Sequence, residues 1–305
     1  MNRQGNKKNP CGGIEWTHYF GPRSGYTANP VRGCRHGCRW VMPNGDIAIC
    51  YAEAIATNLA TKAYPGGFAH VTWHPDELAE IRSHTEPCGI FIDSMSDLFG
   101  QDVQPEWLDE VIQTIRACPQ HVFFSLTKNP SRFRQFQGIS NPWPSNWLVG
   151  ISYPPTFMFG KRWTLAQQRV WFEKALLNLC ASPAQSRWVS VEPLSLDLSD
   201  ILDSYRTELC FAVIGAASNG PKYYQPDRDI FRRTLHAFNG MNVFFKGNLD
   251  RNLAVEVAGK WREEFPRLMN DTIDYHRAAQ AHDFPQCSNP LTTPFATAPM
   301  AKFCR

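Results

Sequence analysis

The chain has 305 residues, long enough for one large α/β domain or two small ones, and its 43% of hydrophobic residues is ordinary for a globular protein. No apolar run reaches the ~18 residues that cross a bilayer, and no apolar stretch follows the basic start, so we predict neither a membrane span nor a secretory signal and expect a cytoplasmic protein. The net charge of +3 permits a nucleic-acid partner without arguing for one.

Short apolar runs typical of strands alternate along the chain with longer segments of helical periodicity. The predicted strands are 13–17, 69–73, 89–93, 121–126, 146–152, 187–192, 210–215 and 241–246. The predicted helices are 51–62, 75–83, 105–117, 164–179, 227–239 and 251–265. Buried strands that alternate with helices are typical of a parallel sheet with helical cover. The pattern predicts an α/β fold, a whole or partial (β/α) TIM-like barrel, with an open parallel sheet as the alternative.

The alternation decays after about residue 250, and this change sets the domain boundaries that we expect. Residues 1–12 would form an N-terminal arm, and 13–265 would form the barrel. The stretch 266–305 becomes rich in Pro, Thr and Ala, so we predict a C-terminal extension that is extended or disordered in part. Its Cys287 and Cys304 have no assigned role.

The strongest chemical signal is the loop 33–53, which contains Cys34, Cys38 and Cys50. Cys34 and Cys38 have three residues between them, and Cys50 follows after eleven more, just before a predicted helix. Closely spaced loop cysteines let several thiolates converge on one inorganic core, which is how proteins hold Fe–S clusters. We predict that the three thiols bind a 4Fe–4S cluster. Three ligands would leave one iron open for a substrate or cofactor.

The cysteine spacing leaves two alternatives to a cluster. A structural zinc site needs four ligands, and the first two cysteines of the loop could be completed by Cys11, His18 or His36. The other alternative is three unligated thiols. Most remaining cysteines sit beside or inside apolar segments, where a free thiol packs as a small hydrophobe, so we predict reduced thiols. The interleaved arginines of the loop would stabilise thiolates, meet an anionic substrate or simply be solvated; these are Arg32, Arg35 and Arg39.

Polar side chains follow several predicted strands at positions that would meet at the mouth of a barrel. Glu192 could accept hydrogen bonds from a ribose or act as an acid/base group, although a solvated carboxylate is the alternative. Lys128 and Lys246 could hold a phosphate or carboxylate, or could reach out to water from the rim. Asp93 and Ser94 could equally close a strand with a turn.

Two further strand ends are candidates for cofactor contacts. Ser152 ends the predicted strand 146–152. The sequence GAASNG (215–220) predicts a small-residue turn, with Gly215 and Ser218, that lets an adenine or carboxylate approach the backbone closely. It lacks the full dinucleotide fingerprint.

Several motifs together resemble a phage-associated three-cysteine-motif family of uncharacterised function. They are IEWT (14–17), NPVRGC (29–34), CYAE (50–53), DSMSDLF (93–99), LTKNP (126–130), VSVEPL (189–194) and FFK (244–246). That family is similar to the radical S-adenosylmethionine superfamily, which has a (β/α) barrel with a cluster loop after the first strand. The eleven-residue gap before Cys50 departs from the usual spacing, and we expect a loop that bulges at Pro43, Asn44 and Gly45.

The resemblance implies a radical S-adenosylmethionine enzyme, in which a 5′-deoxyadenosyl radical takes hydrogen from a substrate after an external donor supplies an electron. It implies that Asp93 and Ser94 bind the methionine ammonium, with Ser152, Glu192, Gly215 and Ser218 as further cofactor contacts. Glu192, Lys128 and Lys246 are the catalytic candidates. The phage association makes nucleic acid or a modified nucleotide the candidate substrate. The alternative is a non-catalytic, zinc- or cluster-stapled binding module.

Overall fold

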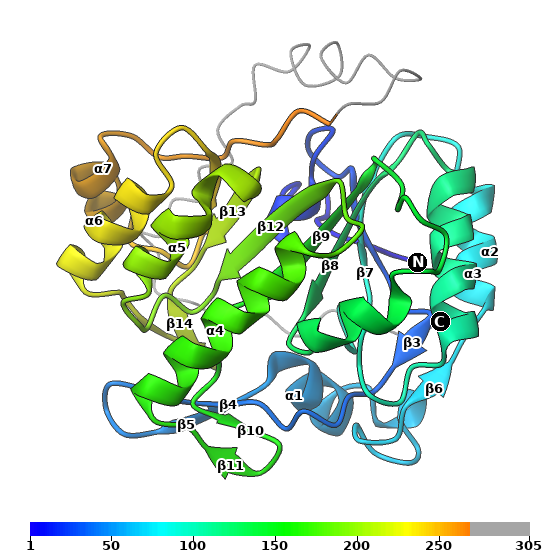
Figure 1. The fold of residues 1–305 in the computed structure, drawn as a ribbon, viewed down its shortest axis with the longest axis horizontal. Coiled ribbons are helices and arrows are strands. Elements are labelled where there is room, and N and C mark those ends of the chain that lie inside the picture. Colours follow the sequence, from blue (N-terminus) through cyan, green and yellow to red (C-terminus); the bar gives the residue numbers. More distant parts are fainter. Residues whose placement is uncertain (269–305) are drawn as a thin grey trace.

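An eight-stranded sheet organises the chain, and the order of its strands follows the sequence (Figure 1). The computed structural model describes residues 1–268. The strands, in order across the sheet, are β1 (Asn2–Arg3), β2 (Gly25–Ala28), β7 (Gly89–Ile92), β8 (Val122–Thr127), β9 (Trp147–Ser152), β12 (Ser186–Val191), β13 (Phe211–Ile214) and β16 (Asn242–Phe245). All neighbours from β2 to β16 are parallel, and only β1 is antiparallel to its partner.

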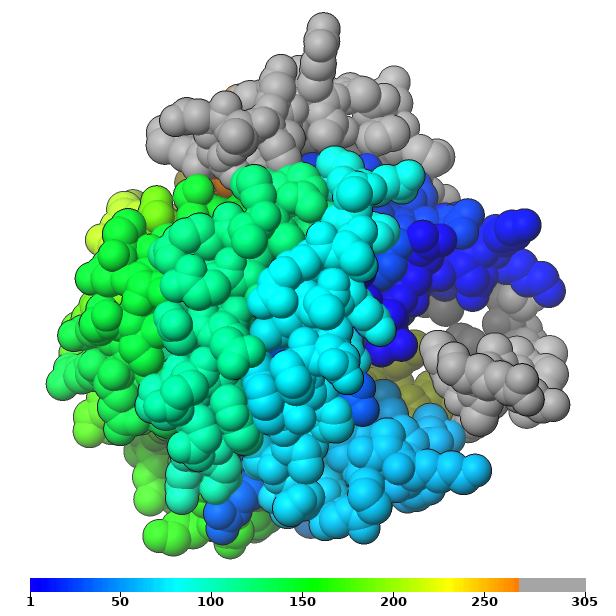
Figure 2. Space-filling view, turned by 90° about the vertical axis from the view of Figure 1, so that its right-hand side faces the viewer, coloured from blue at the N-terminus to red at the C-terminus, as the bar shows by residue number. Residues whose placement is uncertain are grey.

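The helices that connect these strands cover one face of the sheet. They are α2 (Asp76–Ser83), α3 (Pro105–Ala117), α4 (Leu165–Cys180), α5 (Ser199–Tyr205), α6 (Arg228–Ala237) and α7 (Arg251–Ala258). Figure 2 shows α2 and α3 side by side on this surface. Because each parallel strand lies beside the one that precedes it, every crossover returns on the same side, as in a barrel. The predicted α/β fold is confirmed as a partial barrel, since β1 and β16 stay unpaired with each other across residues 1–268.

Alternate residues of the strands build two cores on the two faces. Ile90, Phe123 and Val149 pack against the helices. Phe91, Phe124 and Trp188 face the other way and pack around Trp16, whose ring centroid lies 4.8, 5.4 and 5.0 Å from theirs. A period of two along each strand produces this division.

The segment around Trp16 is a short 3₁₀ helix, η1 (Glu15–Thr17), and the prediction of a strand over 13–17 was wrong. The first parallel strand is instead β2, a four-residue strand that the sequence analysis missed. Both edges of β2 are already paired, with β1 on one side and β7 on the other. Residues 13–17 therefore have no edge of β2 to join, and they fill the space over the inner face of the sheet.

Several predicted elements match closely and others are shorter than expected. The predicted helix 105–117 coincides with α3, and Thr164 begins α4 with a capping box to Gln167. The predicted helix 251–265 ends with α7, because Gly259 adopts a left-handed conformation at φ 76° and stops the helix. The predicted strand 69–73 is reduced to β6 (Thr72–Trp73), which pairs with β3 (Val31–Arg32) outside the main sheet.

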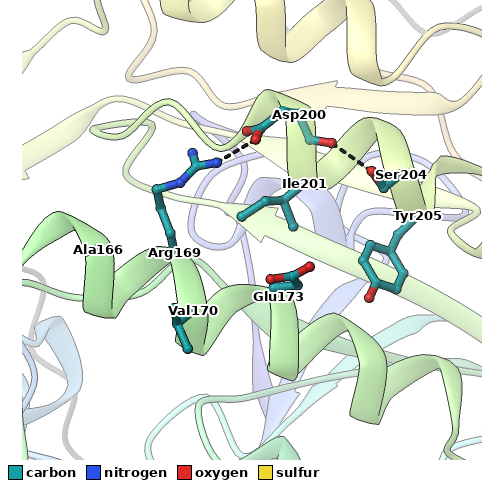
Figure 3. A pocket seen from close by; sticks show the side chains of 8 residues that line it. All are labelled: Ala166, Arg169, Val170, Glu173, Asp200, Ile201, Ser204 and Tyr205. Atoms are coloured by element: carbon teal, nitrogen blue, oxygen red, sulfur yellow. Dashed lines mark hydrogen bonds and ion pairs between the residues drawn. The ribbon is translucent and has the colours of Figure 1, made fainter.

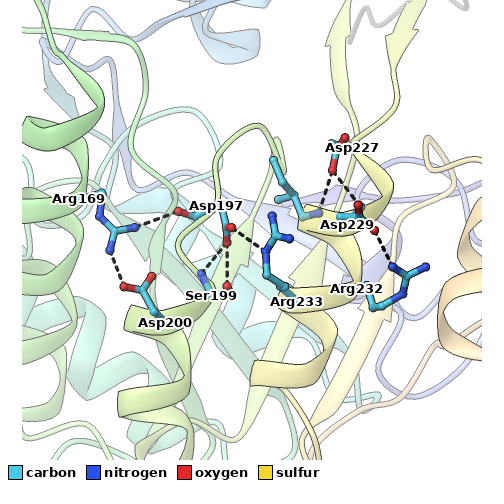
Figure 4. Close-up of polar contacts among 9 residues, drawn as sticks. Arg169, Asp197, Ser199, Asp200, Asp227, Asp229, Arg232 and Arg233 are labelled. Carbon is cyan, nitrogen blue, oxygen red and sulfur yellow. Dashed lines mark hydrogen bonds and ion pairs between the residues drawn. The ribbon is translucent and has the colours of Figure 1, made fainter.

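Ion pairs join three of the covering helices (Figure 4). Arg169 of α4 forms an ion pair with Asp200 of α5 and donates to the Asp197 carbonyl at 3.1 Å. Arg233 of α6 contacts the Asp197 carboxylate at 2.8 Å. Asp197 therefore links all three helices at the position where α5 begins.

Residues on both sides of the expected barrel region, 13–265, contact it. Asn2 and Arg3, in the predicted arm, form β1. Leu268 is buried beside Trp16 in the inner core, and the Tyr19 hydroxyl donates to the Pro266 carbonyl at 2.6 Å. The remainder of the predicted extension, with Cys287 and Cys304, lies outside the described residues. No helix within 1–268 is long and apolar enough to cross a membrane.

Candidate functional site

The carboxyl ends of the parallel strands lie on one edge of the sheet, and this edge contains the candidate site. Asp93 follows β7, Lys128 follows β8, Glu192 follows β12 and Lys246 follows β16. Two small elements accompany this edge in Figure 1: the helix α1 (Tyr51–Asn58) and a sheet of β4 (Arg39–Val41), β5 (Ile47–Ile49), β10 (Phe157–Met158) and β11 (Lys161–Arg162). The predicted site residues thus share one edge.

The three cysteines of the loop are free thiols, close enough to act on one another electrostatically. Cys38 is buried and the other two are half-buried. The Cys50 amide donates to the Cys38 carbonyl at 3.2 Å, so the bulge at 43–45 does return Cys50 to the first pair. Burial raises the pKa of Cys38 to about 12, and burial together with the Asp97 charge raises the pKa of Cys34 further. The charge of Cys50 acts on both pKa values.

Lys128 provides a positive charge beside these thiols. Burial alone would lower the pKa of its ammonium, but the charges of Cys38, Cys50 and Asp97 outweigh burial and raise it. The Lys128 Nζ lies 5.8 Å from the ring centroid of Trp40, on β4. Lys128 can therefore offset negative charge that forms on the thiols.

Asp97 holds the start of the cysteine loop and the end of β8. Its Oδ2 accepts from the Lys128 amide at 2.8 Å and lies 3.4 Å from the His36 Nδ1. Its Oδ1 accepts from the Phe99 amide at 2.9 Å. The sequence analysis did not select Asp97 for the site, and it considered His36 only as a zinc ligand. The DSMSDLF motif contained the signal for Asp97, but no local rule separates its second carboxylate from a turn residue.

Asp93 and Ser94 stand where β7 ends, but they face the backbone of neighbouring segments. Asp93 has a left-handed φ of 60°, and its Oδ1 accepts from the Val31 amide at 2.9 Å. Its Oδ2 is buried with no hydrogen-bond partner among the described residues, and burial raises the pKa of this carboxyl well above its usual range. The Ser94 hydroxyl donates to Asn29 Oδ1 at 3.1 Å, and the Ser94 carbonyl accepts from the Tyr51 hydroxyl.

Glu192 and Lys246 form an ion pair at the other end of the same edge. A Cβ on Gly215 would lie 3.1 Å from the Glu192 Cγ and 3.2 Å from the Lys246 Cδ, so a larger residue here would press on both side chains. Asn248 closes the group, because its Oδ1 accepts from the Ala216 amide at 3.1 Å. The predicted residues Glu192, Lys246 and Gly215 are therefore in mutual contact.

Glu15 is a third charged group at this end, and the sequence analysis missed it. It lies next to Trp16 in η1, and its Oε2 accepts from the Gly247 amide at 2.7 Å. Burial raises its pKa, and the Lys246 charge partly offsets this effect. Glu15 occurs in the IEWT motif, but only the tertiary structure brings η1 to the end of β16.

Two predicted cofactor contacts, Ser152 and Ser218, lie apart from the charged groups described above. Ser152 is buried where β9 ends, opposite Ser190 of β12. Ser218 is exposed in β14 (Ala217–Asn219), which pairs with β15 (Lys222–Tyr224) as a hairpin. The prediction of one small-residue turn over 215–220 was therefore wrong, because the chain first extends into β14 and turns afterwards.

The loop arginines are all in ion pairs. Arg32 contacts Glu77 at 2.8 Å, Arg35 contacts Asp102 at 3.1 Å, and Arg39 contacts Glu53 at 2.6 Å. These contacts orient the arginines towards acidic partners in the surrounding segments. They leave Lys128 as the cation whose pKa responds to all three thiols.

Two of the three further zinc ligands that the sequence offered are engaged elsewhere, whereas the third, His36, has a buried Nε2 without a hydrogen-bond partner among residues 1–268. His18 has both ring nitrogens engaged, by the Gly12 carbonyl at 3.1 Å and the Gly25 amide at 3.1 Å. Cys11 is disulfide-bonded, whereas the other described cysteines, among them those in apolar segments on which the prediction of reduced thiols rested, are free. Residues 1–268 contain no group of three or more Cys, His, Asp or Glu that could hold a single metal ion. A four-iron cluster binds each thiolate at a different iron and needs no such grouping.

A hollow lies on the helical side of the molecule, between α4 and α5 (Figure 3). Arg169 and Asp200 pair across it, and Tyr205 lies at its other end. None of its lining residues follows a strand end, so it is separate from the candidate site.

The chain is similar in sequence to one protein family and in structure to several solved structures. The family described as "Protein of unknown function (DUF5131)" matches residues 12–247. No curated protein matches the chain. Among solved structures, a double mutant of spore photoproduct lyase with bound AdoMet and dinucleoside spore photoproduct is similar at a TM-score of 0.42 and 11% identity, over 70% of this chain and 61% of that chain. The lyase complexed with dinucleoside spore photoproduct gives 0.41 and 11%, over 69% and 60%. The chain thus spans about 61% of the length of these proteins.

Proposed function

The chain belongs to the DUF5131 family of proteins of unknown function, and we propose that it is a radical S-adenosylmethionine enzyme. One observation carries this proposal: the free thiols of Cys34, Cys38 and Cys50 lie together at the carboxyl edge of a partial (β/α) barrel, with Lys128 beside them. Active sites of barrels lie at this edge. The resemblance of the motifs to the three-cysteine-motif family supports the same conclusion.

Cys34, Cys38 and Cys50 would hold a 4Fe–4S cluster. When bound, the cluster supplies the electron with which S-adenosylmethionine is cleaved to a radical that abstracts hydrogen. The chain's own part is to hold and shield the reactants. Burial raises the pKa of Cys34 and Cys38 and so favours their protonated form in the iron-free protein, so loading would release protons from them, and the Lys128 ammonium would offset the new negative charge.

The other residues of the edge would position the cofactor and the substrate. Ser94 and Asp93 are proposed to bind the methionine ammonium, although both now contact the Asn29 and Val31 segment. Gly215 is proposed as a backbone contact for the adenine, although the Glu192 and Lys246 side chains now lie against it. Ser152 and Ser218 stay proposals for further contacts with the cofactor.

Glu192 and Lys246 are proposed as groups that contact the substrate. Glu192 Oε1 accepts from the Lys246 ammonium, so the pair offers a remaining carboxylate oxygen and remaining N–H donors side by side. Nucleic acid or a modified nucleotide is the proposed substrate class, on the motif resemblance alone. An external donor would supply the electron, and an oxygen-sensitive cluster suits a cytoplasmic setting.

The test is anaerobic reconstitution with iron and sulfide, followed by reduction and addition of S-adenosylmethionine. We expect broad visible absorption, four irons per chain, and slow formation of 5′-deoxyadenosine and methionine even without substrate. Stoichiometric zinc without visible absorption would overturn the cluster and favour a stapled binding module. A reducible cluster that neither binds nor cleaves S-adenosylmethionine would leave a cluster protein without this activity.

A further inference from the structure

Asp97 is a buried carboxylate whose two oxygens serve different parts of the chain; the residue is 6% exposed. Oδ1 accepts from the Phe99 amide at 2.9 Å, two residues ahead, which is a local turn contact. Oδ2 accepts from the Lys128 amide at 2.8 Å, across 31 residues of chain, and lies 3.4 Å from the His36 Nδ1. Only Oδ2 therefore joins segments that are distant in sequence.

His36 connects this carboxylate to the cysteine loop. It lies between Cys34 and Cys38, and the residue is 3% exposed. Nδ1 faces Asp97, and Nε2 has no hydrogen-bond partner among residues 1–268. The ring edge packs on Phe159 with centroids 5.0 Å apart, and the Phe159 amide donates to the His36 carbonyl at 2.7 Å. The contact to Asp97 is thus the polar contact that orients this imidazole.

Lys128 connects the same carboxylate to the charge beside the thiols. Its backbone amide is held by Asp97, while its ammonium lies over the Trp40 ring. A shift of the β8 end would therefore move the ammonium away from the cysteines. One oxygen of Asp97 fixes both the loop with Cys34 and Cys38 and the backbone of this cation.

We propose that Asp97 is a positioning residue that clamps the cysteine loop, through His36, and the backbone of Lys128, through its amide, into one arrangement before iron binds. This inference depends on the proposed function in one respect only, namely that the ligand of the cysteine loop is an iron–sulfur cluster. The clamp itself is a property of the iron-free protein. It preorganises the thiols, so that loading requires less ordering of the loop.

The first measurement is hydrogen–deuterium exchange on the iron-free protein, read from peptides that cover 33–40. In the wild type the Cys34 amide donates to the Phe68 carbonyl at 2.8 Å and should exchange slowly. Asp97→Asn keeps only one acceptor oxygen. That oxygen cannot accept from the Phe99 amide and also serve the Lys128 amide and His36. His36→Phe keeps the ring volume against Phe159 and removes Nδ1. We expect both variants to exchange about ten-fold faster or more in this segment.

The matched control is Asp102→Asn. Asp102 pairs with Arg35 of the same loop at 3.1 Å, but this pair is largely exposed. Exposed pairs contribute little, so exchange should stay within about two-fold of the wild type. The double variant Asp97→Asn/His36→Phe should exchange no faster than Asp97→Asn alone, because both changes remove the same contact, the one between His36 and Asp97. Full additivity, or an Asp97→Asn effect no larger than that of Asp102→Asn, would overturn the clamp.

The second measurement is the rate at which a chelator removes iron from the reconstituted protein. Loss should be about ten-fold faster in Asp97→Asn and His36→Phe than in Asp102→Asn, and equal rates would count against the clamp. If Asp97→Asn does not fold, His36→Phe decides, because it leaves the Phe99 and Lys128 contacts intact. If the wild type takes up no iron, the proposed function fails, while exchange on the iron-free protein still decides the clamp.

Discussion

Lys246 and Glu192 form an ion pair at the carboxyl edge of the sheet, although 54 residues separate them in the chain. Their side chains are 22% and 27% exposed, so the pair is partly shielded from water. Burial alone would lower the pKa of the Lys246 ammonium, but the Glu192 charge and hydrogen bond, with a contribution from Glu15, raise it. The pair therefore joins the ends of β12 and β16 by charge as well as by the strands between them.

Replacing Lys246 alone should destabilise the protein more than removing the whole pair. Lys246→Met leaves the Glu192 carboxylate without its partner, and we expect a loss of about 2 kcal/mol in the free energy of unfolding. Glu192→Gln/Lys246→Met leaves no unpaired charge at Glu192 and should cost less. Urea unfolding measures both. Lys260→Met is the control, since Lys260 is 69% exposed in its pair with Glu264 and should change stability by less than about 0.5 kcal/mol. A double variant as unstable as Lys246→Met would contradict the expectation.

Single replacement of a loop cysteine should abolish both the cluster and S-adenosylmethionine cleavage. Cys34→Ala, Cys38→Ala and Cys50→Ala each remove one of three thiolate ligands, and a cluster held by two is not retained. Iron content, visible absorption and 5′-deoxyadenosine formation after anaerobic reconstitution measure the result. Cys180→Ala is the control, because Cys180 ends α4 on the helical side and should leave all three readouts intact. Retention of a full cluster in Cys50→Ala would remove that residue from the ligand set.

Removal of the Trp16 ring should strongly destabilise the protein. Trp16 is 3% exposed and contacts Phe91, Phe124 and Trp188 on the inner face of the sheet. Trp16→Ala leaves a cavity among these rings, and we expect a loss of about 3–5 kcal/mol in the free energy of unfolding. Leu177→Ala, at a position that is 51% exposed on α4, should cost less than about 0.5 kcal/mol. A Trp16→Ala protein with an unchanged denaturation midpoint would show that η1 does not support the inner core.

The buried carboxyl of Asp93 should make stability depend on pH in a defined direction. Burial raises its folded-state pKa, so between the unfolded value, about 3.9, and the folded value the native state binds more protons than the unfolded state. Stability from this group is therefore fully present below about pH 3.9 and falls as pH rises. Asp93→Asn keeps an acceptor for the Val31 amide and removes the charge.

We therefore expect the stability of Asp93→Asn, relative to the wild type, to increase from pH 4 to pH 7 in urea unfolding. Asparagine also tolerates the left-handed φ of 60°, but that contribution does not vary with pH. A difference that stays constant across this range would show that Asp93 ionises in the folded protein as it does in the unfolded chain.

The sequence predicted the strands and helices with long, clear periodicity, and it predicted which residues follow the strands. The apolar runs 89–93, 121–126 and 241–246 correspond to β7, β8 and β16. Strands that are buried on both faces have nearly continuous apolar sequences, so these runs could be recognised as strands. Thr164 and Gln167 determined the start of α4 through contacts within one turn. Such signals are local, so they can be recognised without knowing the fold.

Short or unusual elements could not be predicted from local pattern. The strand β2 has four residues and begins with glycine, so its sequence is not distinct from a loop. The residues 14–17 are apolar enough for a strand, but both edges of β2 are paired, one with β1 and the other with β7. Glu15, His36 and Asp97 became site residues through contacts that span from 31 to more than 200 positions.

The sequence by itself determined an α/β chain with three cysteines in one loop and charged residues after buried strands, because periodicity, spacing and residue chemistry are properties of neighbours along the chain. Only the tertiary structure decided that the barrel is partial, that Trp16 fills its inner face, and that Glu15 reaches Gly247 while Asp97 meets both His36 and Lys128. The physical reason is that burial and hydrogen bonding between distant segments depend on which strand edges and core spaces are already occupied.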